Sequence, residues 1–317
     1  MIMRKSGVRI VALIAIALLF SITALSCANN GVAHGENVYY GLYPQSRVGE
    51  ELENTLESMY LSDELPLDNG YYKYDGAYYV RKEVVNNYLE NIELFTLFTG
   101  FSEGDICWFK AEPIEWRVLD VNRKKGVLLV AEKILSGGPF SAQDSDGGNK
   151  WETSDIREFL NGEFYNMAFF NETKLPLVQD TENYYMSYPS RARRNLPSTK
   201  DTVRLLGYEE AKNSKYFADD LDRISTPTAY ASACGAMKIT EELIRFAIES
   251  TDGEYDNVGE ISDYEAFFGS GIYWTNTSDD GDENAYVVYE YGNLLSYYYF
   301  TADRGMRPVI RLPYGAV

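Results

Sequence analysis

The sequence predicts an α+β fold built mainly from antiparallel strands. Strand-like and helix-like segments do not alternate regularly along the chain, which argues against a doubly wound α/β fold. Turn residues join neighbouring strand-like segments at Asp75-Gly76 and at residues 122–126, and such short connections produce antiparallel hairpins. Of the 317 residues 45% are hydrophobic, which is enough for a sizeable core. No repeat of fixed period is evident, and we expect one domain over residues 38–317.

The first half of the chain is expected to contain two hairpins and a short helix. Leu52, Leu56 and Met59 recur at helical spacing, which predicts a helix over residues 50–59. Alternating or β-rich runs predict the strands. They are residues 38–45, 71–74, 77–80, 116–121 and 127–131, of which the last two are the best candidates for the core.

The second half is expected to run from helices back to strands. Thr153-Ser154-Asp155 is an N-cap segment before a one-sided apolar helix with Ile156, Phe159 and Leu160 at helical spacing. Polar stretches at 171–200 and 250–271 are expected to be surface loops. The remaining predicted elements are helices over 205–217 and 241–248 and strands over 285–300 and 308–312.

The N-terminus has the organisation of a secretory leader. Three basic residues precede an apolar run at 10–20, and small residues follow before Cys27. This run is too short to span a bilayer comfortably. Ala24-Leu25-Ser26-Cys27 resembles a lipoprotein box of the relaxed kind seen in spirochaetes, although Leu does not stand three residues before the Cys. We therefore expect removal of residues 1–26, lipidation of Cys27 and a polar tether over 27–37, with ordinary signal-peptidase cleavage as the alternative.

Charge and histidine content exclude several functions. The chain has 48 acidic and 29 basic side chains, net −19, which disfavours nucleic acid as a partner. The only histidine is His34, so the body of the protein can form no Ser-His-Asp or Cys-His pair and no zinc site with imidazole ligands. We expect no enzyme activity, no cofactor and no metal, and a protein exported to the outer membrane and displayed at the cell surface.

Two further features leave alternatives open. Cys107 and Cys234 are an even pair in an exported chain, and they predict either one disulfide or two isolated buried thiols. The acidic segments 144–149 and 279–284 could hold calcium, but neither has the spacing of an EF-hand, and solvated loops are the simpler explanation.

Five short motifs occur in order along the chain. They are Tyr43-Pro44-Gln45-Ser46, Trp116-Arg117-Val118-Leu119, Leu129-Val130-Ala131-Glu132-Lys133, Trp151 to Arg157 and Gly305 to Leu312. In this order they resemble a widespread bacterial exported family with a C-type-lectin fold of the formylglycine-generating-enzyme type. The resemblance implies that the termini pair in one sheet and that a ligand site lies on the C-terminal strands and loops. Formylglycine-generating enzymes use a close pair of cysteines, whereas Cys107 and Cys234 are 127 positions apart, which argues against that activity.

The leader and the C-terminal composition together are similar to the treponemal variable-protein family. These proteins are targets of diversity-generating retroelements, which rewrite adenine-containing codons near the 3′ end of one gene. The resemblance implies a surface lipoprotein that binds an unknown protein or glycan through a diversified C-terminal surface.

The residues themselves support a binding surface at 273–303. Tyr, Asn, Asp and Ser fill 16 of these 31 positions, against 11 of 31 in the polar stretch 171–201, so only the combination with a strand-like pattern is distinctive. Tyrosine offers a large rigid ring, while Ser, Asn and Asp offer adaptable hydrogen bonds, a mixture that paratopes favour. We expect the candidates to be exposed and clustered on one face. They are Tyr273, Asn276, Ser278, Asp279, Asp280, Asn284, Tyr289, Tyr291, Asn293, Ser296, Tyr297, Tyr298 and Tyr299.

Gly292-Asn293 predicts a two-residue turn between the strands of this region. In that register Tyr289, Tyr291, Ser296 and Tyr298 share one face, and Tyr286, Val288, Leu295, Tyr297 and Tyr299 share the other. Tyr286, Trp274 and residues 305–312 are expected to be scaffold.

Three other functions remain open at this stage. They are a tyrosine-rich face without function, a non-variable adhesin or carbohydrate-binding lectin-like module, and an uncharacterised hydrolase.

Overall fold

A computed structural model describes most of the chain beyond the leader. Val32–Val317 belong to one compact unit. Cys27 lies outside the described residues, as do 143–147 in the first acidic segment and 281–282 in the second. The described residues are 32–86, 92–142, 148–187, 190–250, 260–280, 283–300 and 304–317.

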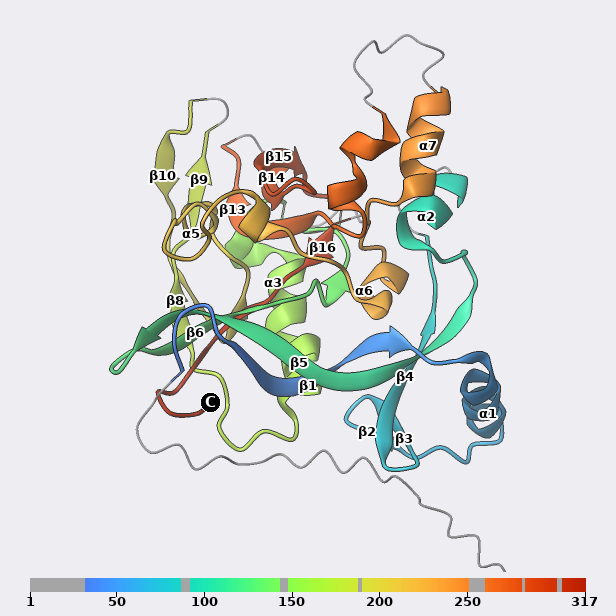
Figure 1. The fold of residues 1–317 in the computed structure, drawn as a ribbon. Helices are drawn as coiled ribbons and strands as arrows, with labels where there is room; N and C mark the ends of the chain where they lie inside the picture. Colours follow the sequence, from blue (N-terminus) through green and yellow to red (C-terminus); the bar gives the residue numbers. More distant parts are fainter. Residues whose placement is uncertain are drawn as a thin grey trace, which may run out of the picture. The chain divides into compact units, whose positions relative to one another are not determined.

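Two large sheets, a two-stranded sheet and several short helices make up the fold (Figure 1). The strands are β1 (Asn37–Arg47), β2 (Leu67–Asp68), β3 (Tyr71–Tyr74), β4 (Ala77–Glu83), β5 (Ile106–Asn122), β6 (Gly126–Ala131), β7 (Ser136–Gly137), β8 (Gln179–Thr181), β9 (Tyr184–Met186), β10 (Arg193–Asn195), β11 (Thr199–Asp201), β12 (Val203–Arg204), β13 (Tyr273–Ser278), β14 (Asn284–Val288), β15 (Leu294–Tyr298), β16 (Gly305–Met306) and β17 (Val309–Leu312). The α-helices are α1 (Glu50–Leu61), α2 (Ile92–Thr99), α3 (Asp155–Phe159), α4 (Tyr165–Phe169), α5 (Tyr208–Ala211), α6 (Ala229–Ala233) and α7 (Glu241–Ser250). Shorter helical turns are η1 (Trp151–Thr153), η2 (Leu160–Phe164), η3 (Leu221–Arg223), η4 (Ile261–Asp263) and η5 (Glu265–Phe267).

The predicted α+β class with mainly antiparallel strands is confirmed. Within the described part of the chain, only β13 pairs in parallel with other named strands, namely β9 and β16. The hairpins predicted around Asp75-Gly76 and residues 122–126 are present as β3–β4 and β5–β6. The helices predicted over 50–59 and 241–248 are also present, as α1 and α7.

The larger sheet joins the two ends of the compact unit. Its strand order is β12-β17-β6-β5-β4-β3-β2, and β1 pairs with β5. The long strand β5 therefore bonds to β1, β4 and β6 along different parts of its length. The last strand, β17, lies between β12 and β6. The first and last strands thus belong to the same sheet, but they do not pair with each other, so the expected pairing of the termini is wrong.

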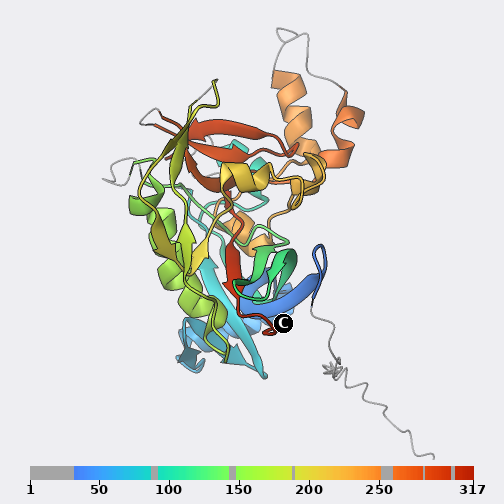
Figure 2. The same cartoon turned by 90° about the vertical axis from the view of Figure 1, so that its left-hand side faces the viewer.

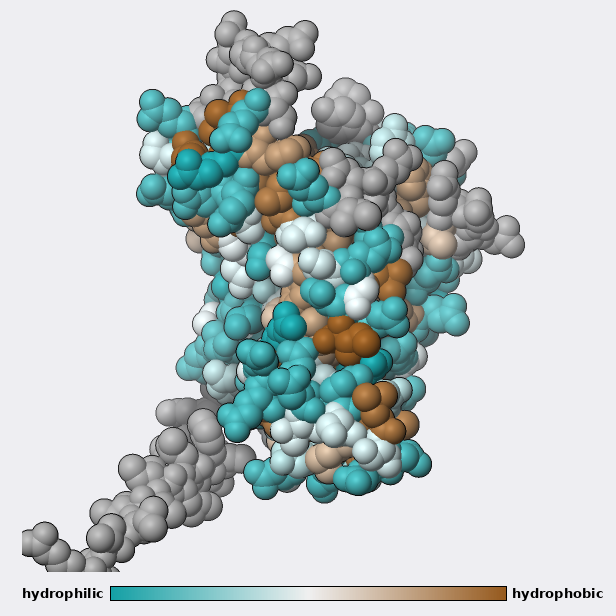
Figure 3. Space-filling model, turned by 90° about the vertical axis from the view of Figure 1, so that its right-hand side faces the viewer, coloured by the Kyte–Doolittle hydropathy of each residue, from teal (hydrophilic) through white to brown (hydrophobic). Residues whose placement is uncertain are grey.

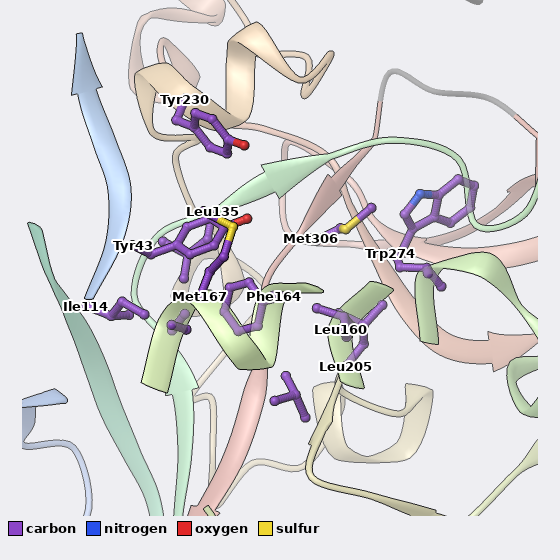
Figure 4. Close-up of a cluster of buried hydrophobic side chains, with 14 of the residues drawn as sticks. Tyr43, Ile114, Leu135, Leu160, Phe164, Met167, Leu205, Tyr230, Trp274 and Met306 are labelled. Carbon is purple, nitrogen blue, oxygen red and sulfur yellow. The ribbon is translucent and has the colours of Figure 1, made fainter. Parts of the chain in front are cut away.

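A continuous helical segment packs against this sheet. Ser154 caps it as predicted, because its hydroxyl accepts a hydrogen bond from the Arg157 amide. The segment runs through α3, the π-helical turn η2 and α4. Figure 4 shows Leu160 and Phe164 of this segment among buried side chains from elsewhere in the chain, including Tyr43 and Trp274. Burial of these large apolar groups is the main stabilisation of the fold.

The smaller sheet carries the region predicted to bind ligands. Its order is β10-β9-β13-β14-β15, with β16 and β7 attached to β13. Figure 2 shows β13, β14 and β15 at the end of the compact unit away from β1 and β4. One face of β14 packs into the main core through Ala285 and Val287, and the other packs Tyr286 and Val288 into a second cluster. The inner strands of this sheet are therefore buried on both faces.

Two predicted elements are wrong. No long helix spans 205–217, where the only helix is α5; Leu205 and Leu206 enter different apolar clusters, as alternating side chains of an extended chain do. The stretch 171–200 is not only loop, because it contains β8, β9 and β10 and the start of β11. All three residues of β10 are exposed, so these strands lack the apolar alternation by which sequence reveals a strand.

Cys107 and Cys234 are both free thiols. Of the two alternatives, one disulfide or two isolated thiols, the structure therefore favours the isolated thiols. In Figure 3 the surface is largely hydrophilic, with separate apolar patches. Among the described residues, no helix combines the length and apolar character needed to cross a membrane.

Candidate ligand-binding site

The sequence predicts a turn at Gly292-Asn293, but the β14–β15 hairpin turns earlier, through residues 290–292. Val288 pairs with Leu294, and the Tyr289 amide donates to the Asn293 carbonyl at 2.8 Å. The Gly292 amide donates to the Tyr289 carbonyl at 2.8 Å, and Gly292 has φ +80°. The turn is thus a three-residue loop that ends in a left-handed glycine. A Cβ at Gly292 would also collide with the Asp220 carbonyl, so only glycine fits.

This register changes which side chains share a face, because one strand shifts against the other by an odd number of residues. Tyr286 lies opposite Ser296, and Asn284 lies opposite Tyr298. The expectation that Tyr286 shares a face with Leu295, Tyr297 and Tyr299, opposite to Ser296 and Tyr298, is therefore wrong. Tyr297 instead faces the side of Ala285, its cross-strand partner.

Four of the candidate residues are buried, which corrects the expectation that they are exposed. Their exposed fractions are 1% for Tyr273, 3% for Asn276, 1% for Ser278 and 7% for Asp279. The sheet is covered on both faces, so no side chain of β13 points to solvent.

Each of these buried side chains has a hydrogen-bond partner in the scaffold. The Tyr273 hydroxyl donates to the Arg223 carbonyl at 2.7 Å and accepts from Arg307 at 3.0 Å. The Ser278 hydroxyl donates to the Asn149 carbonyl. Asp279 accepts from the Ser296 hydroxyl at 2.8 Å. These contacts hold β13 in the fold rather than presenting it to a ligand.

The other candidates reach the surface in varying degree. Asp280 is exposed, and the Tyr298 side chain is 50% exposed. The half-buried candidates are Asn284, Tyr289, Tyr291, Asn293, Ser296, Tyr297 and Tyr299. The residues expected to be scaffold, Tyr286 and Trp274, are fully buried, so that expectation is confirmed.

Half-exposed aromatic rings gather around the hairpin loop. The Tyr291 ring packs edge-on against Phe267 with centroids 4.6 Å apart, and it lies 6.0 Å from Tyr289. Tyr289 stacks with Tyr297 at 6.4 Å. The Arg304 guanidinium lies over the Tyr297 ring, 4.1 Å from the ring centroid. We call Phe267, Tyr289, Tyr291, Tyr297 and Arg304 the hairpin aromatic cluster.

A buried carboxyl lies within the same loop. Glu290 is 4% exposed, and its Oε2 has no hydrogen-bond partner in the described structure. Burial raises the pKa of Glu290 to about 7, against the opposing charge of Arg304. Burial likewise raises the pKa of Tyr291 to about 12. The tyrosine hydroxyl is therefore a hydrogen-bond donor throughout the neutral range.

A second candidate site is a cavity of about 290 Å³ beside α2 and α6, which the sequence did not predict. Its walls include Phe98, Phe159 and Tyr230, and Cys234 lies among them. Burial raises the pKa of the Cys234 thiol, which favours its protonated form. Among the residues that the structure describes, no group of three or more His, Cys, Asp or Glu side chains is placed to hold a metal ion.

The sequence profile of a family described as a domain of unknown function, DUF6273, matches residues 125–314. The chain belongs to the DUF6273 family. No curated protein and no solved structure matches the chain. The DUF6273 match begins at β6 and includes the whole of the smaller sheet, with the hairpin aromatic cluster inside it. It leaves out β1 to β5, although β5 and β6 are paired in one sheet.

Proposed function

We propose that this DUF6273 chain is an exported, lipid-anchored protein that binds a protein or glycan ligand through the outer part of the β14–β15 hairpin. The observation that carries the proposal is the set of half-exposed rings around Tyr291 on a sheet whose inner strands are buried on both faces. Rigid rings on a fixed support lose little conformational entropy when a ligand binds. Asp280 and Tyr298 are exposed near the other end of the hairpin, where Tyr298 pairs with Asn284, and they extend the proposed surface away from the loop.

We further propose that the fold is C-type-lectin-like, of the formylglycine-generating-enzyme type. Two features support this: the first and last strands share the larger sheet, and a smaller sheet carries the C-terminal hairpin. Tyr289, Tyr297 and Tyr299 pack against the main core. The exposed positions, Asp280 and Tyr298, instead tolerate change, because surface substitutions usually alter stability by only about 0.5 kcal/mol. That tolerance is what a surface diversified by a retroelement requires.

The binding claim is tested with selected ligands and a pair of tyrosine variants. Ligands are selected for the full chain from a carbohydrate array and a phage-displayed peptide library. Replacing Tyr291 and Tyr298 together by Ser should weaken binding of the selected ligand about tenfold or more. Tyr39→Ser, at a tyrosine 65% exposed on β1, is the matched control and should leave binding unchanged. Equal binding by the double variant and the control would contradict the proposal.

The anchor is tested separately. Cys27→Ala should leave the protein without lipid and shift it from the membrane fraction to the soluble fraction, measured by fractionation and by incorporation of labelled palmitate. Unchanged membrane association would show that the anchor is not at Cys27.

A further inference from the structure

The cavity of about 290 Å³ beside α2 and α6 lies outside the hairpin aromatic cluster and has recognition groups of its own. Its volume is at the lower end of the range of small-molecule sites, so it fits one small molecule rather than a peptide or a glycan. Lys82 and Glu163 are its two charged lining residues, one of each sign. The other lining residues are apolar, small or neutral polar groups.

Four aromatic rings line the cavity, and they come from three helices. Phe95 and Phe98 stand three residues apart on α2, which places them on one face of that helix. Phe159 ends α3, and Tyr230 lies on α6. The Tyr230 ring is supported by an edge-on contact with Phe109, with centroids 5.3 Å apart. A planar ring in this cavity meets aromatic side chains, with which it forms edge-on and offset contacts.

The most deeply buried lining residues carry no charge at neutral pH. Burial raises the pKa of the Tyr230 hydroxyl and of the Cys234 thiol, so both stay protonated. Thr99 and Ser136 are neutral and are 1% and 4% exposed. The inner part of the cavity therefore suits an uncharged ring, and charged parts of a ligand belong at Lys82 and Glu163.

The two charged residues stand at the outer side of the cavity. Lys82 lies on the same side of β4 as Val80, which packs into the main core, whereas Arg81 forms its ion pair on the opposite side. Glu163 follows Phe159 by four residues in the continuous helical segment, so the two share a face. Lys82 is half-buried and Glu163 is exposed, and both also line a neighbouring hollow of about 550 Å³.

Both charged side chains are available to a ligand. In the part of the chain that the structure describes, neither Lys82 nor Glu163 has an ion-pair partner. Their charges act on the inner wall, because the charge of Lys82 opposes the effect of burial on the pKa of Cys234 and that of Glu163 adds to the effect of burial on the pKa of Tyr230. An ammonium and a carboxylate that do not pair with each other match the carboxylate and the ammonium of a zwitterion.

From this geometry we infer that the cavity binds a free aromatic amino acid, with its ring among the four aromatic side chains, its carboxylate at Lys82 and its ammonium at Glu163. The site goes beyond the function proposed for the hairpin and shares no residue with the hairpin aromatic cluster, so either can fail without the other.

The first test compares ligands. L-phenylalanine is titrated into the full chain in detergent and followed by calorimetry and saturation-transfer NMR. Phenethylamine lacks the carboxylate and 3-phenylpropionate lacks the amine, so each should bind about tenfold more weakly or worse. L-leucine has both charges but no ring, and it should also bind more weakly. Absence of L-phenylalanine binding, or equal binding by any of the three analogues, would overturn the inference.

Two substitutions assign the charges. Lys82→Gln should weaken L-phenylalanine binding about tenfold but not phenethylamine binding, and Glu163→Gln should weaken L-phenylalanine binding about tenfold but not 3-phenylpropionate binding. The retained analogue shows in each case that the variant is folded. Lys110→Gln on β5 and Glu158→Gln on α3, both exposed and outside the cavity, are the matched controls. Unchanged L-phenylalanine affinity in either cavity variant contradicts the assignment.

Cys234 reports where the amino acid lies. Its side chain is half-buried, whereas that of Cys107 is buried, so an alkylating reagent at alkaline pH reaches Cys234 first. Saturating L-phenylalanine should slow this alkylation, measured by mass spectrometry of the peptide that contains Cys234. An unchanged rate at saturation would place the amino acid elsewhere and refute the site.

Discussion

β6 and β13 are both six-residue strands in which every residue is buried, yet their compositions are opposite. β6 reads Gly-Val-Leu-Leu-Val-Ala, and its burial follows from the hydrophobic effect. β13 reads Tyr-Trp-Thr-Asn-Thr-Ser, and its polar side chains bond within the scaffold. Thr275 donates to the Tyr286 carbonyl at 2.9 Å, and Thr277 accepts from the Tyr208 amide at 2.9 Å. The comparison teaches that a strand rich in Tyr, Asn and Ser can be interior when its polar atoms have partners.

The largest expected effect comes from removing the strand that holds β6 in its sheet. Deleting residues 305–317 removes β17, which lies between β12 and β6. The deletion should abolish folding, because it exposes the core face of β6 and its unpaired backbone groups. Circular dichroism and thermal melting measure this. A cooperative melt like that of the full chain would show that β17 is dispensable.

A single apolar truncation in β6 should have the next largest effect. Leu129 is fully buried in the main core, and Leu129→Ala should lower the free energy of unfolding by about 2–5 kcal/mol through lost burial and a cavity. Urea denaturation measures the change. A loss below about 1 kcal/mol would mean that the site collapses around the smaller side chain.

Glu290 tests the rule that buried polar atoms need partners, because one of its oxygens has none. Its folded pKa of about 7 lies above the ordinary value of 4.5, so the folded state holds a proton that the unfolded state releases between these values. The contribution of Glu290 to stability should therefore be greatest below about pH 4.5 and fall as pH rises to about 7. Glu290→Gln should remove this dependence and be more stable than the natural chain at pH 8, by on the order of 3 kcal/mol.

The control for this prediction is pH itself. At pH 4 the carboxyl is protonated in both states, and the difference between Glu290→Gln and the natural chain should vanish. A difference that is the same at pH 4 and pH 8 would contradict the assignment to this carboxyl.

The smallest expected effect distinguishes a scaffold tyrosine from a surface tyrosine. Tyr273→Phe should cost about 1–3 kcal/mol, because it removes a buried hydrogen bond to the Arg223 carbonyl and one from the charged Arg307 guanidinium, while Arg307 Nη1 still donates to that carbonyl. Tyr298→Phe, at a half-exposed ring, should change stability by no more than about 0.5 kcal/mol. Equal effects at both positions, measured by urea denaturation, would remove the distinction between β13 and the hairpin.

The sequence predicted those elements that neighbouring residues specify, such as a tight turn, an apolar strand or a helix cap. Asp75-Gly76 and the apolar run of β6 lead directly to their hairpins, and Ser154 caps its helix as expected. The register of β14–β15 was not predictable, since Gly292 serves equally as the first residue of a two-residue turn and as the last residue of a three-residue loop. In the loop that forms, Gly292 lies against the Asp220 carbonyl and its own carbonyl accepts from Arg223, and these contacts come from a distant part of the chain.

The candidate site was predictable in outline only. The tyrosines of the hairpin do gather near the surface, but the burial of Tyr273 and Asn276 depends on β9 and α5, which pack over them. The strands of the 171–200 region that form this cover have no apolar alternation.

The central claim is that β13 is scaffold and that the outer part of the β14–β15 hairpin is a diversified binding surface. Its most direct test is a comparison of the 3′ end of the gene with neighbouring DNA. We expect a reverse-transcriptase gene and a near-copy nearby, with differences confined to template adenines. These differences should fall in the codons of Asp280, Tyr291 and Tyr298 and leave those of Tyr273, Ser278 and Tyr286 unchanged. Absence of a near-copy, or differences concentrated in the codons of the buried residues, would contradict the account.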